Sequence, residues 1–154
     1  MSAYKHIIDI VSRTKSILDN SKGSEYETTL FLNCCLGLLI IPQQENNRTK
    51  PISIRKEVSY EEWGIDSTQI KGDKATGDLD EIARHFRNSL SHGRFDIVEC
   101  NPGNSIEVIR IKDYDSEKKL RQDKPNFDLT ITISDFKQFV QKYASEVENT
   151  IKNL

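Results

Sequence analysis

The sequence contains no apolar segment long enough to cross a membrane. Its longest apolar run, from Leu36 to Ile41, is much shorter than the roughly 20 residues that a membrane-spanning helix needs. The first residues, Met1 to His6, lack the charged start and apolar core of a secretory signal peptide. We therefore expect a cytoplasmic protein that does not bind membranes.

Cysteine and glycine are scarce, and this limits the chemistry available to the chain. The three cysteines lack the spacing of a zinc site, and Cys34 and Cys35 lie in apolar surroundings that predict buried, inert thiols. The segment Gly72-Asp73-Lys74 lacks the spacing of a phosphate-binding loop. We therefore expect no metal, no cofactor and no catalytic cysteine.

The chain also lacks an excess of positive charge. Its 22 Lys and Arg residues are outnumbered by 24 Asp and Glu residues, for a net charge of −2. Any binding to RNA would therefore depend on a local basic patch. A hydrophobic content of 36% beside 30% charged residues is typical of an ordinary globular protein. Without a linker or an internal repeat, residues 1–154 are predicted to form a single domain.

The N-terminal half predicts two helices followed by a long loop. Apolar residues at three- and four-residue spacing predict a helix from about Ala3 to Asn20. Ser24 and Glu27 form a capping-box pattern before a helix that is apolar nearly all round over 30–41, which should be central and buried. We expect Pro42 to end it. Within this helix, Asn33 should be a buried hydrogen-bonding residue or should face a second copy.

Residues 43–77 are polar and irregular, and are predicted to be a long connecting loop. A short helix starting near Ser59 would let Trp63 attach this loop to the core. After it, residues 95–100, 106–112 and 127–133 predict three strands of a small antiparallel sheet. Asp113 to Pro125 should be a charged, solvated loop. A final helix, capped by Ser134, presents one apolar face: Phe136, Phe139, Val140, Tyr143, Val147 and Ile151.

A further helix is predicted from about Asp78 to His92, with Gly93 as its C-terminal stop. At about 100° per residue, its side chains separate into two faces. The apolar face should pack on the other helices and consists of Leu79, Ile82, Ala83, Phe86 and Leu90. The polar face opposite consists of Arg84, Arg87, Asn88, Ser91 and His92.

This polar face has the residue types that RNA cleavage needs in the absence of a metal. Imidazole titrates near neutral pH, so His92 can take a proton from a ribose 2′-hydroxyl or give one to the leaving oxygen. Arg87, about 7.5 Å away along the helix axis, can hold two phosphate oxygens. Asn88 could orient the histidine or bind phosphate, as could Ser91, with Arg84 as a further contact. Since one histidine cannot readily be base and acid in the same step, a two-fold dimer would supply the second.

Structural interpretations of these residues remain open. Polar residues opposite an apolar stripe are typical of any surface helix, and a histidine in the last turn favours the helix dipole. Glu81 and His85, with Asp78 nearby, lack the second histidine of a zinc-protease helix, so we expect a surface ion pair. The basic residues within 113–125 could touch phosphates, but such a run more often belongs to a solvated loop.

The segment Arg87-Asn88-Ser89-Leu90-Ser91-His92 resembles the Arg-polar-x3-His signature of the HEPN superfamily (higher eukaryotes and prokaryotes nucleotide-binding domains). The superfamily places this signature near the end of a bundle helix. The flanking Phe86 and Gly93 and the apolar helix over 30–40 are also similar. The whole layout resembles a plasmid- and defence-associated HEPN group with strands inserted before the last helix.

This resemblance implies a mainly α fold: a HEPN-like up-and-down helical bundle with a small antiparallel β insertion, residues 95–133, before the last helix. It implies a metal-independent endoribonuclease, active as a homodimer, that leaves 2′,3′-cyclic phosphate and 5′-hydroxyl ends. Arg87 and His92 would be the catalytic pair, and Asn88 the polar residue after the arginine. A toxin or antiviral role, with an antitoxin or defence partner protein, would follow. The alternative is a non-catalytic HEPN module that binds a protein or a nucleotide.

Overall fold

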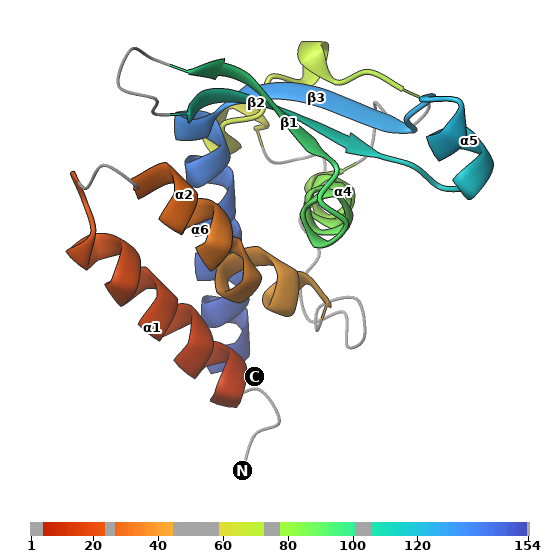
Figure 1. Cartoon of the computed structure of the whole chain (residues 1–154). Coiled ribbons are helices and arrows are strands. Elements are labelled where there is room, and N and C mark those ends of the chain that lie inside the picture. The colour runs from red at the N-terminus through yellow and green to blue at the C-terminus, as the bar shows by residue number, and fades with distance from the viewer. Residues whose placement is uncertain (1–4, 24–26, 45–58, 73–77, 101–105, 154) are drawn as a thin grey trace.

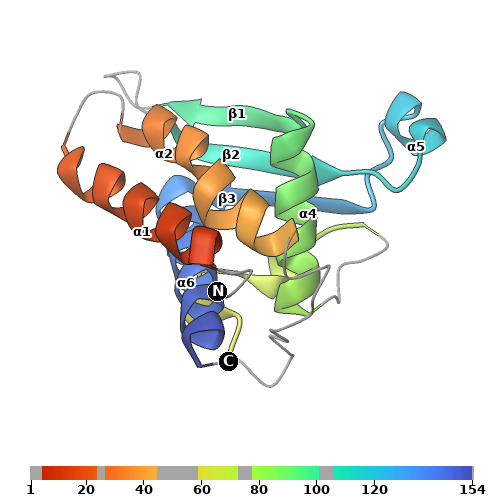
Figure 2. The same cartoon turned by 90° about the horizontal axis from the view of Figure 1, so that it is seen from below.

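A computed structural model gives the structure of residues 5–23, 27–44, 59–72, 78–100 and 106–153. The protein is mainly helical, with one three-stranded antiparallel sheet before the last helix, as predicted (Figure 1). The first two helices and the last lie together, and the sheet covers one side of the last helix and of the helix that precedes the strands (Figures 1 and 2). In the described part of the chain, no helix is long and apolar enough to span a membrane.

The helices α1 (Lys5–Asn20) and α2 (Glu27–Cys35) form where the apolar spacing predicts them. Helix α1 buries Ile7, Val11 and Leu18. The Glu27 carboxylate accepts a hydrogen bond of 2.9 Å from the backbone N–H of Gly23, the residue before the predicted cap Ser24. Its proposed partner Ser24, and the predicted start of the first helix near Ala3, lie outside the described residues.

Helix α2 does not stop at Pro42. It continues as a π-helix, η1 (Leu36–Ile40), in which the N–H of Ile41 bonds to the carbonyl of Leu36, and residues 41–44 are again helical. The prediction that Pro42 ends the helix is therefore wrong. Proline destabilises a regular helix because it lacks an N–H and crowds a carbonyl one turn back. Here Pro42 follows a π-helical turn and not a regular α-helical one.

The expectation that this helix is buried all round is also wrong in part. Leu38 and Leu39 are fully buried, but Leu36 is 56% exposed and Asn33 is exposed, which excludes a buried bridging role for Asn33 within the chain. Gly37 permits a close approach to α1, because a Cβ there would collide with the hydroxyl of Thr14.

The cysteines that precede the π-helix differ in environment. Cys35 is buried, as expected, and burial raises the pKa of its thiol. Cys34 is half-buried, and burial also raises the pKa of that thiol, so neither has the lowered pKa of a reactive cysteine.

The strands β1 (Phe95–Cys100), β2 (Ile106–Asp113) and β3 (Phe127–Thr132) pair in the order β1-β2-β3. The alternation in β3 buries Phe127, Leu129 and Ile131, as predicted. Between β2 and β3, a short helix α5 (Glu117–Arg121) interrupts the segment that we expected to be a loop throughout.

The last helix, α6 (Ile133–Lys152), buries its whole predicted apolar face. Its N-cap is Thr132 and not Ser134, because the extended backbone at Thr132 lets its hydroxyl accept a 3.1 Å hydrogen bond from the N–H of Asp135. Residues 59–72 contain two 3-10 turns, η2 (Glu61–Trp63) and η3 (Ser67–Gln69). Trp63 is 4% exposed and packs edge-on against Phe139, which confirms that it attaches this segment to the core.

Candidate functional site

Helix α4 (Leu79–Ser91) carries the residues of the predicted site. Asp78 caps its start by accepting a 3.0 Å hydrogen bond from the N–H of Glu81. The predicted apolar stripe is confirmed: Leu79, Ile82, Ala83 and Phe86 are buried, and Leu90 is partly buried against the same core.

The C-terminal end of α4 exposes His92. Gly93 adopts a left-handed conformation with φ of 63°, and its N–H bonds to the carbonyl of Leu90 at 3.2 Å. The N–H of Arg94 bonds to the carbonyl of Ser89 at 2.7 Å, which completes a Schellman motif. The chain therefore turns sharply after His92, and the side chains of Ser91 and His92 are exposed at the tip of the helix.

Arg87 is held from the side of the π-helix. Its Nε donates a 3.0 Å hydrogen bond to Oε1 of Gln43, a residue that is only 1% exposed. Burial, followed by repulsion from Arg84, lowers the pKa of Arg87 below its ordinary value. A guanidinium nevertheless stays charged at neutral pH. Within the described ranges, its terminal NH2 groups have no hydrogen-bond partner.

Asn88 is held from the other side, by the last residue of β2. The Oδ2 atom of Asp113 accepts a 3.0 Å hydrogen bond from Nδ2 of Asn88 and a 2.8 Å hydrogen bond from Nδ1 of His85. Its Oδ1 accepts from the backbone N–H of Tyr114 at 2.9 Å and lies 3.6 Å from a terminal nitrogen of Arg94. Asp113 thus joins two turns of α4 to the end of the sheet.

The environment of Asp113 favours its charged form. Burial acts to raise the pKa of this carboxyl, but hydrogen bonds from His85 and Asn88 outweigh burial and lower it below the ordinary value. We expected Asp113 to belong to a solvated loop, and this is wrong, since it is 4% exposed.

The prediction of a surface ion pair between Glu81 and His85 is also wrong. Glu81 pairs with Arg84 at 2.9 Å, and His85 is buried and stacked on Phe127 with ring centroids 4.6 Å apart. His85 is buried because the sheet covers a second side of α4. On that side, Ser89 donates a 2.6 Å hydrogen bond to the carbonyl of Lys112. In the described part of the chain, no cluster of three or more His, Cys, Asp or Glu is placed to hold a metal ion.

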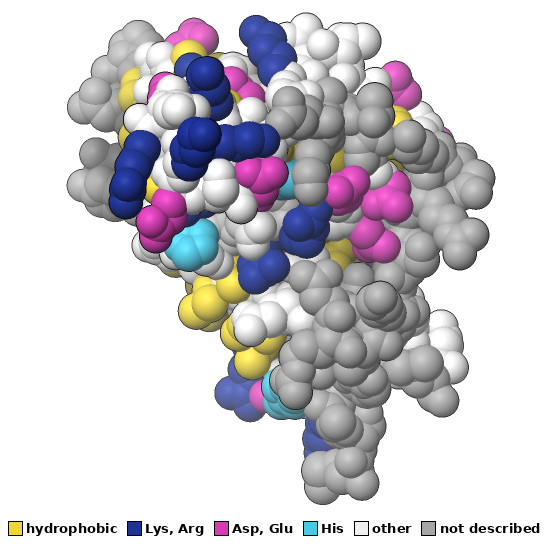
Figure 3. Space-filling view, turned by 90° about the vertical axis from the view of Figure 1, so that its right-hand side faces the viewer, with side chains coloured by type: hydrophobic (Ala, Val, Ile, Leu, Met, Phe, Trp, Pro, Cys, Tyr) yellow, Lys and Arg dark blue, Asp and Glu magenta, His cyan; other side chains and the backbone are white. Residues whose placement is uncertain are grey.

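The five predicted site residues therefore differ in their exposure and in their partners. Arg87 and Asn88 are half-buried and anchored, Arg84 is paired with Glu81, and Ser91 and His92 are exposed. No contact within the described ranges joins Arg87 to His92 in a single copy of the chain. On the side of the molecule where α5 projects, Lys and Arg side chains gather, with acidic side chains interspersed among them (Figure 3). This face is mixed in sign.

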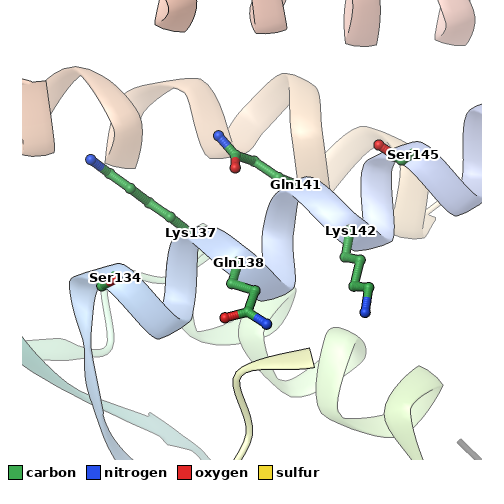
Figure 4. Close-up of a pocket in the computed structure, with 6 residues that line it drawn as sticks. All are labelled: Ser134, Lys137, Gln138, Gln141, Lys142 and Ser145. Carbon is green, nitrogen blue, oxygen red and sulfur yellow. The ribbon is translucent and has the colours of Figure 1, made fainter. Parts of the chain in front are cut away.

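A broad hollow lies elsewhere, on the exposed side of α6. Its volume is about 550 Å³, and it is lined by Ser134, Lys137, Gln138, Gln141, Lys142 and Ser145 (Figure 4). Gln138 and Lys142 both donate 2.8 Å hydrogen bonds to the carbonyl of Glu62, so part of its lining fastens the 59–72 segment to α6. None of the predicted site residues lines it.

Sequence reasoning missed Gln43, His85 and Asp113. The sequence predicts Gln43 in a loop because proline commonly ends a helix. His85 and Asn88 are three residues apart and so share one side of α4, a spacing that hinted at a common partner. Asp113 extends the strand pattern of 106–112 by one residue, but no pattern in the sequence places it beside α4.

The fold and the site define a class: a mainly helical protein with an Arg-Asn-x3-His motif at the exposed end of a helix. A family model that matches residues 1–154 shows that the chain belongs to the HEPN superfamily. The family described by this model is HEPN pEK499 p136. No curated protein and no solved structure matches the chain significantly.

Proposed function

We propose that this HEPN protein is a metal-independent endoribonuclease. The observation that carries the proposal is the anchoring of the motif: Arg87 and Asn88 are fixed by buried partners on two sides, while the side chain of His92 is exposed at the tip of α4. Functional side chains held by packed neighbours next to an exposed acid–base group are typical of a catalytic site.

In the proposed reaction, the ribose 2′-oxygen attacks the adjacent phosphorus and the bond to the 5′-oxygen breaks. The ring of one His92 takes the proton of the 2′-hydroxyl. The His92 of a second copy, across a two-fold axis, gives a proton to the departing 5′-oxygen. Arg87 stabilises the charge that develops on the phosphate, and Ser91 and Arg84 contact the flanking backbone. The products carry 2′,3′-cyclic phosphate and 5′-hydroxyl ends.

This proposal extends to the assembly and the biological role. The helices would form the up-and-down bundle of the superfamily, and two copies of α4 would meet in the active dimer. Such an enzyme would act in the cytoplasm as a toxin or an antiviral effector, under the control of an antitoxin or another defence protein.

The test is cleavage of structured and unstructured RNA in the presence of EDTA. The wild type should cut, whereas His92→Ala and Arg87→Ala should lose at least 100-fold in rate, the usual scale for loss of a general acid–base or charge-stabilising group. His6→Ala changes an exposed histidine on α1 and is the matched control, which should retain full activity. Equal cleavage by the wild type and His92→Ala would contradict the assignment.

A non-catalytic HEPN module remains the second candidate. The mixed charge of the face that includes α5 favours it, because a strongly basic surface would suit RNA better (Figure 3). Tight binding of a protein partner that survives both Arg87→Ala and His92→Ala, with no RNA cleavage by the wild type, would support this function.

A further inference from the structure

The side-chain amide of Asn88 has a defined orientation, and Asp113 determines it. An ionised carboxylate can only accept hydrogen bonds, so the group of Asn88 that faces Asp113 must be its NH2. The Oδ1 atom is on the other arm of the planar amide. Within the described ranges, Oδ1 accepts no hydrogen bond. Asn88 therefore presents an acceptor away from the sheet.

A donor on the same side of α4 as this acceptor is the ring N–H of His92. The two residues are four apart, and the backbone N–H of His92 bonds to the carbonyl of Asn88 at 3.1 Å, so they lie on successive turns of α4. The His92 ring is exposed, and an exposed imidazole can exchange its proton between its two nitrogens. A bond from one ring N–H to Oδ1 of Asn88 would select one tautomer and leave the other nitrogen as the base.

Asp113 is well suited to hold this arrangement rigid. It is buried, and it is held in turn by His85, which is stacked flat on Phe127, and by the N–H of Tyr114. Each bond therefore restricts the next, from the end of β2 to the side chain of Asn88. The hydrogen bond from Ser89 to the carbonyl of Lys112 keeps α4 and β2 in register beside it.

We propose that Asp113 is a positioning residue that acts through Asn88 to orient the His92 ring and select its tautomer. This inference rests on the proposed function, because it assigns the His92 ring its role as a base. It adds a residue from the β insertion to a site otherwise formed by one helix. It also makes Asn88 an acceptor for the histidine and not a phosphate ligand.

The test measures the ring nitrogens of His92 by NMR in the free protein, where tautomers are distinguished without any substrate. Asp113→Asn and Asn88→Ala should both shift these nitrogen signals to the same new position. Asp128→Asn, the same change at another buried aspartate of the sheet, should leave them unchanged. Asp113→Asn added to Asn88→Ala should cause no further shift, because both changes break the same connection.

In RNA cleavage, each single variant should lose about tenfold in kcat, the effect of one hydrogen bond, with KM within about twofold. Should Asp113→Asn prove unstable, Asn88→Ala leaves the Asp113–His85 bond intact and tests the orientation of His92 alone. His92 signals that move in Asn88→Ala but not in Asp113→Asn would overturn the inference, as would unchanged signals in both. Absence of cleavage by the wild type would contradict the proposed function, while the ring signals would still decide whether Asp113 acts on His92.

Discussion

The side-chain oxygen of Gln43 accepts a 3.0 Å hydrogen bond from Nε of Arg87, which joins the turn after the π-helix to the motif helix. The bond is shielded, since Gln43 is buried and Arg87 is half-buried. A hydrogen bond to Nε restricts the plane of the guanidinium, which would preorient its two terminal NH2 groups for the phosphate of the proposed substrate. The π-helix is part of this arrangement, because it precedes the turn that contains Gln43.

Replacing Gln43 should therefore impair catalysis as well as stability. Gln43→Ala leaves Nε of Arg87 half-buried without its partner, which should lower the free energy of unfolding by about 1–2 kcal/mol and the rate of cleavage by about tenfold. Urea unfolding and RNA cleavage measure the two effects. Gln44→Ala, at the exposed neighbouring position, is the control and should match the wild type. A Gln43→Ala enzyme with wild-type cleavage would show that Arg87 needs no such support.

Replacing Gly93 should lower the rate of RNA cleavage by more than the accompanying loss of stability explains. A Cβ at Gly93 would meet no atom within 4 Å, so Gly93→Ala introduces only the strain of a positive φ, about 1 kcal/mol. Gly23 has the same properties, with φ of 81° and open space, but lies far along the chain from the motif. Both alanine variants should lose similar stability in thermal melts. Only Gly93→Ala should also lower the rate of RNA cleavage, by several-fold, because the strained turn directly follows His92. Equal cleavage rates of the two variants would contradict this.

Acid should reveal the contribution of Asp113 to stability. Its pKa is lowered in the folded state, so its stabilising effect is fully present above the unfolded pKa of about 3.9 and is lost as the pH falls through the lower folded value. Asp113→Asn should thus be less stable than the wild type at pH 7, and the difference should narrow below about pH 4. Unfolding in urea at a series of pH values measures this. A difference that stays constant down to pH 2 would show that Asp113 stabilises the fold by packing alone.

The proposed composite site, which needs two copies of the chain, predicts that activity depends on protein concentration. If each site needs His92 from both protomers, the cleavage rate per chain should fall on dilution in proportion to the fraction of dimer. Sedimentation and cleavage measured over the same range of concentrations give the two curves. A protein that is a monomer throughout and cuts RNA at a constant rate per chain would rule out a composite site.

Much of the fold could be predicted because its signals are local. The apolar face of α6, the alternation in β3 and the stop at Gly93 each follow from spacing or backbone preference within a few residues. Local signals gave a wrong prediction where two candidate residues for the same role lie close together. Thr132 and Ser134 are both good N-caps, and only the observed end of β3 selects Thr132. Pro42 predicts the end of a helix unless the preceding π-helical turn is known.

The support of the candidate site could not be predicted, because it depends on contacts between distant segments. The motif at Arg87, Asn88 and His92 is continuous in sequence and therefore visible. Its anchors, Gln43 and Asp113, are 44 and 25 residues from their partners. The helical pattern of α4 showed one apolar side packed on helices, but it could not show that β2 covers a second side. That covering buries His85, which a helical wheel places among the polar residues.

The most direct measurement of the central claim is the chemistry of the RNA ends. RNA incubated with the wild-type protein in EDTA, and analysed by mass spectrometry, should give fragments with 2′,3′-cyclic phosphate and 5′-hydroxyl ends, and His92→Ala should give none. Fragments with 5′-phosphate ends, or the same cyclic ends from His92→Ala, would contradict the account.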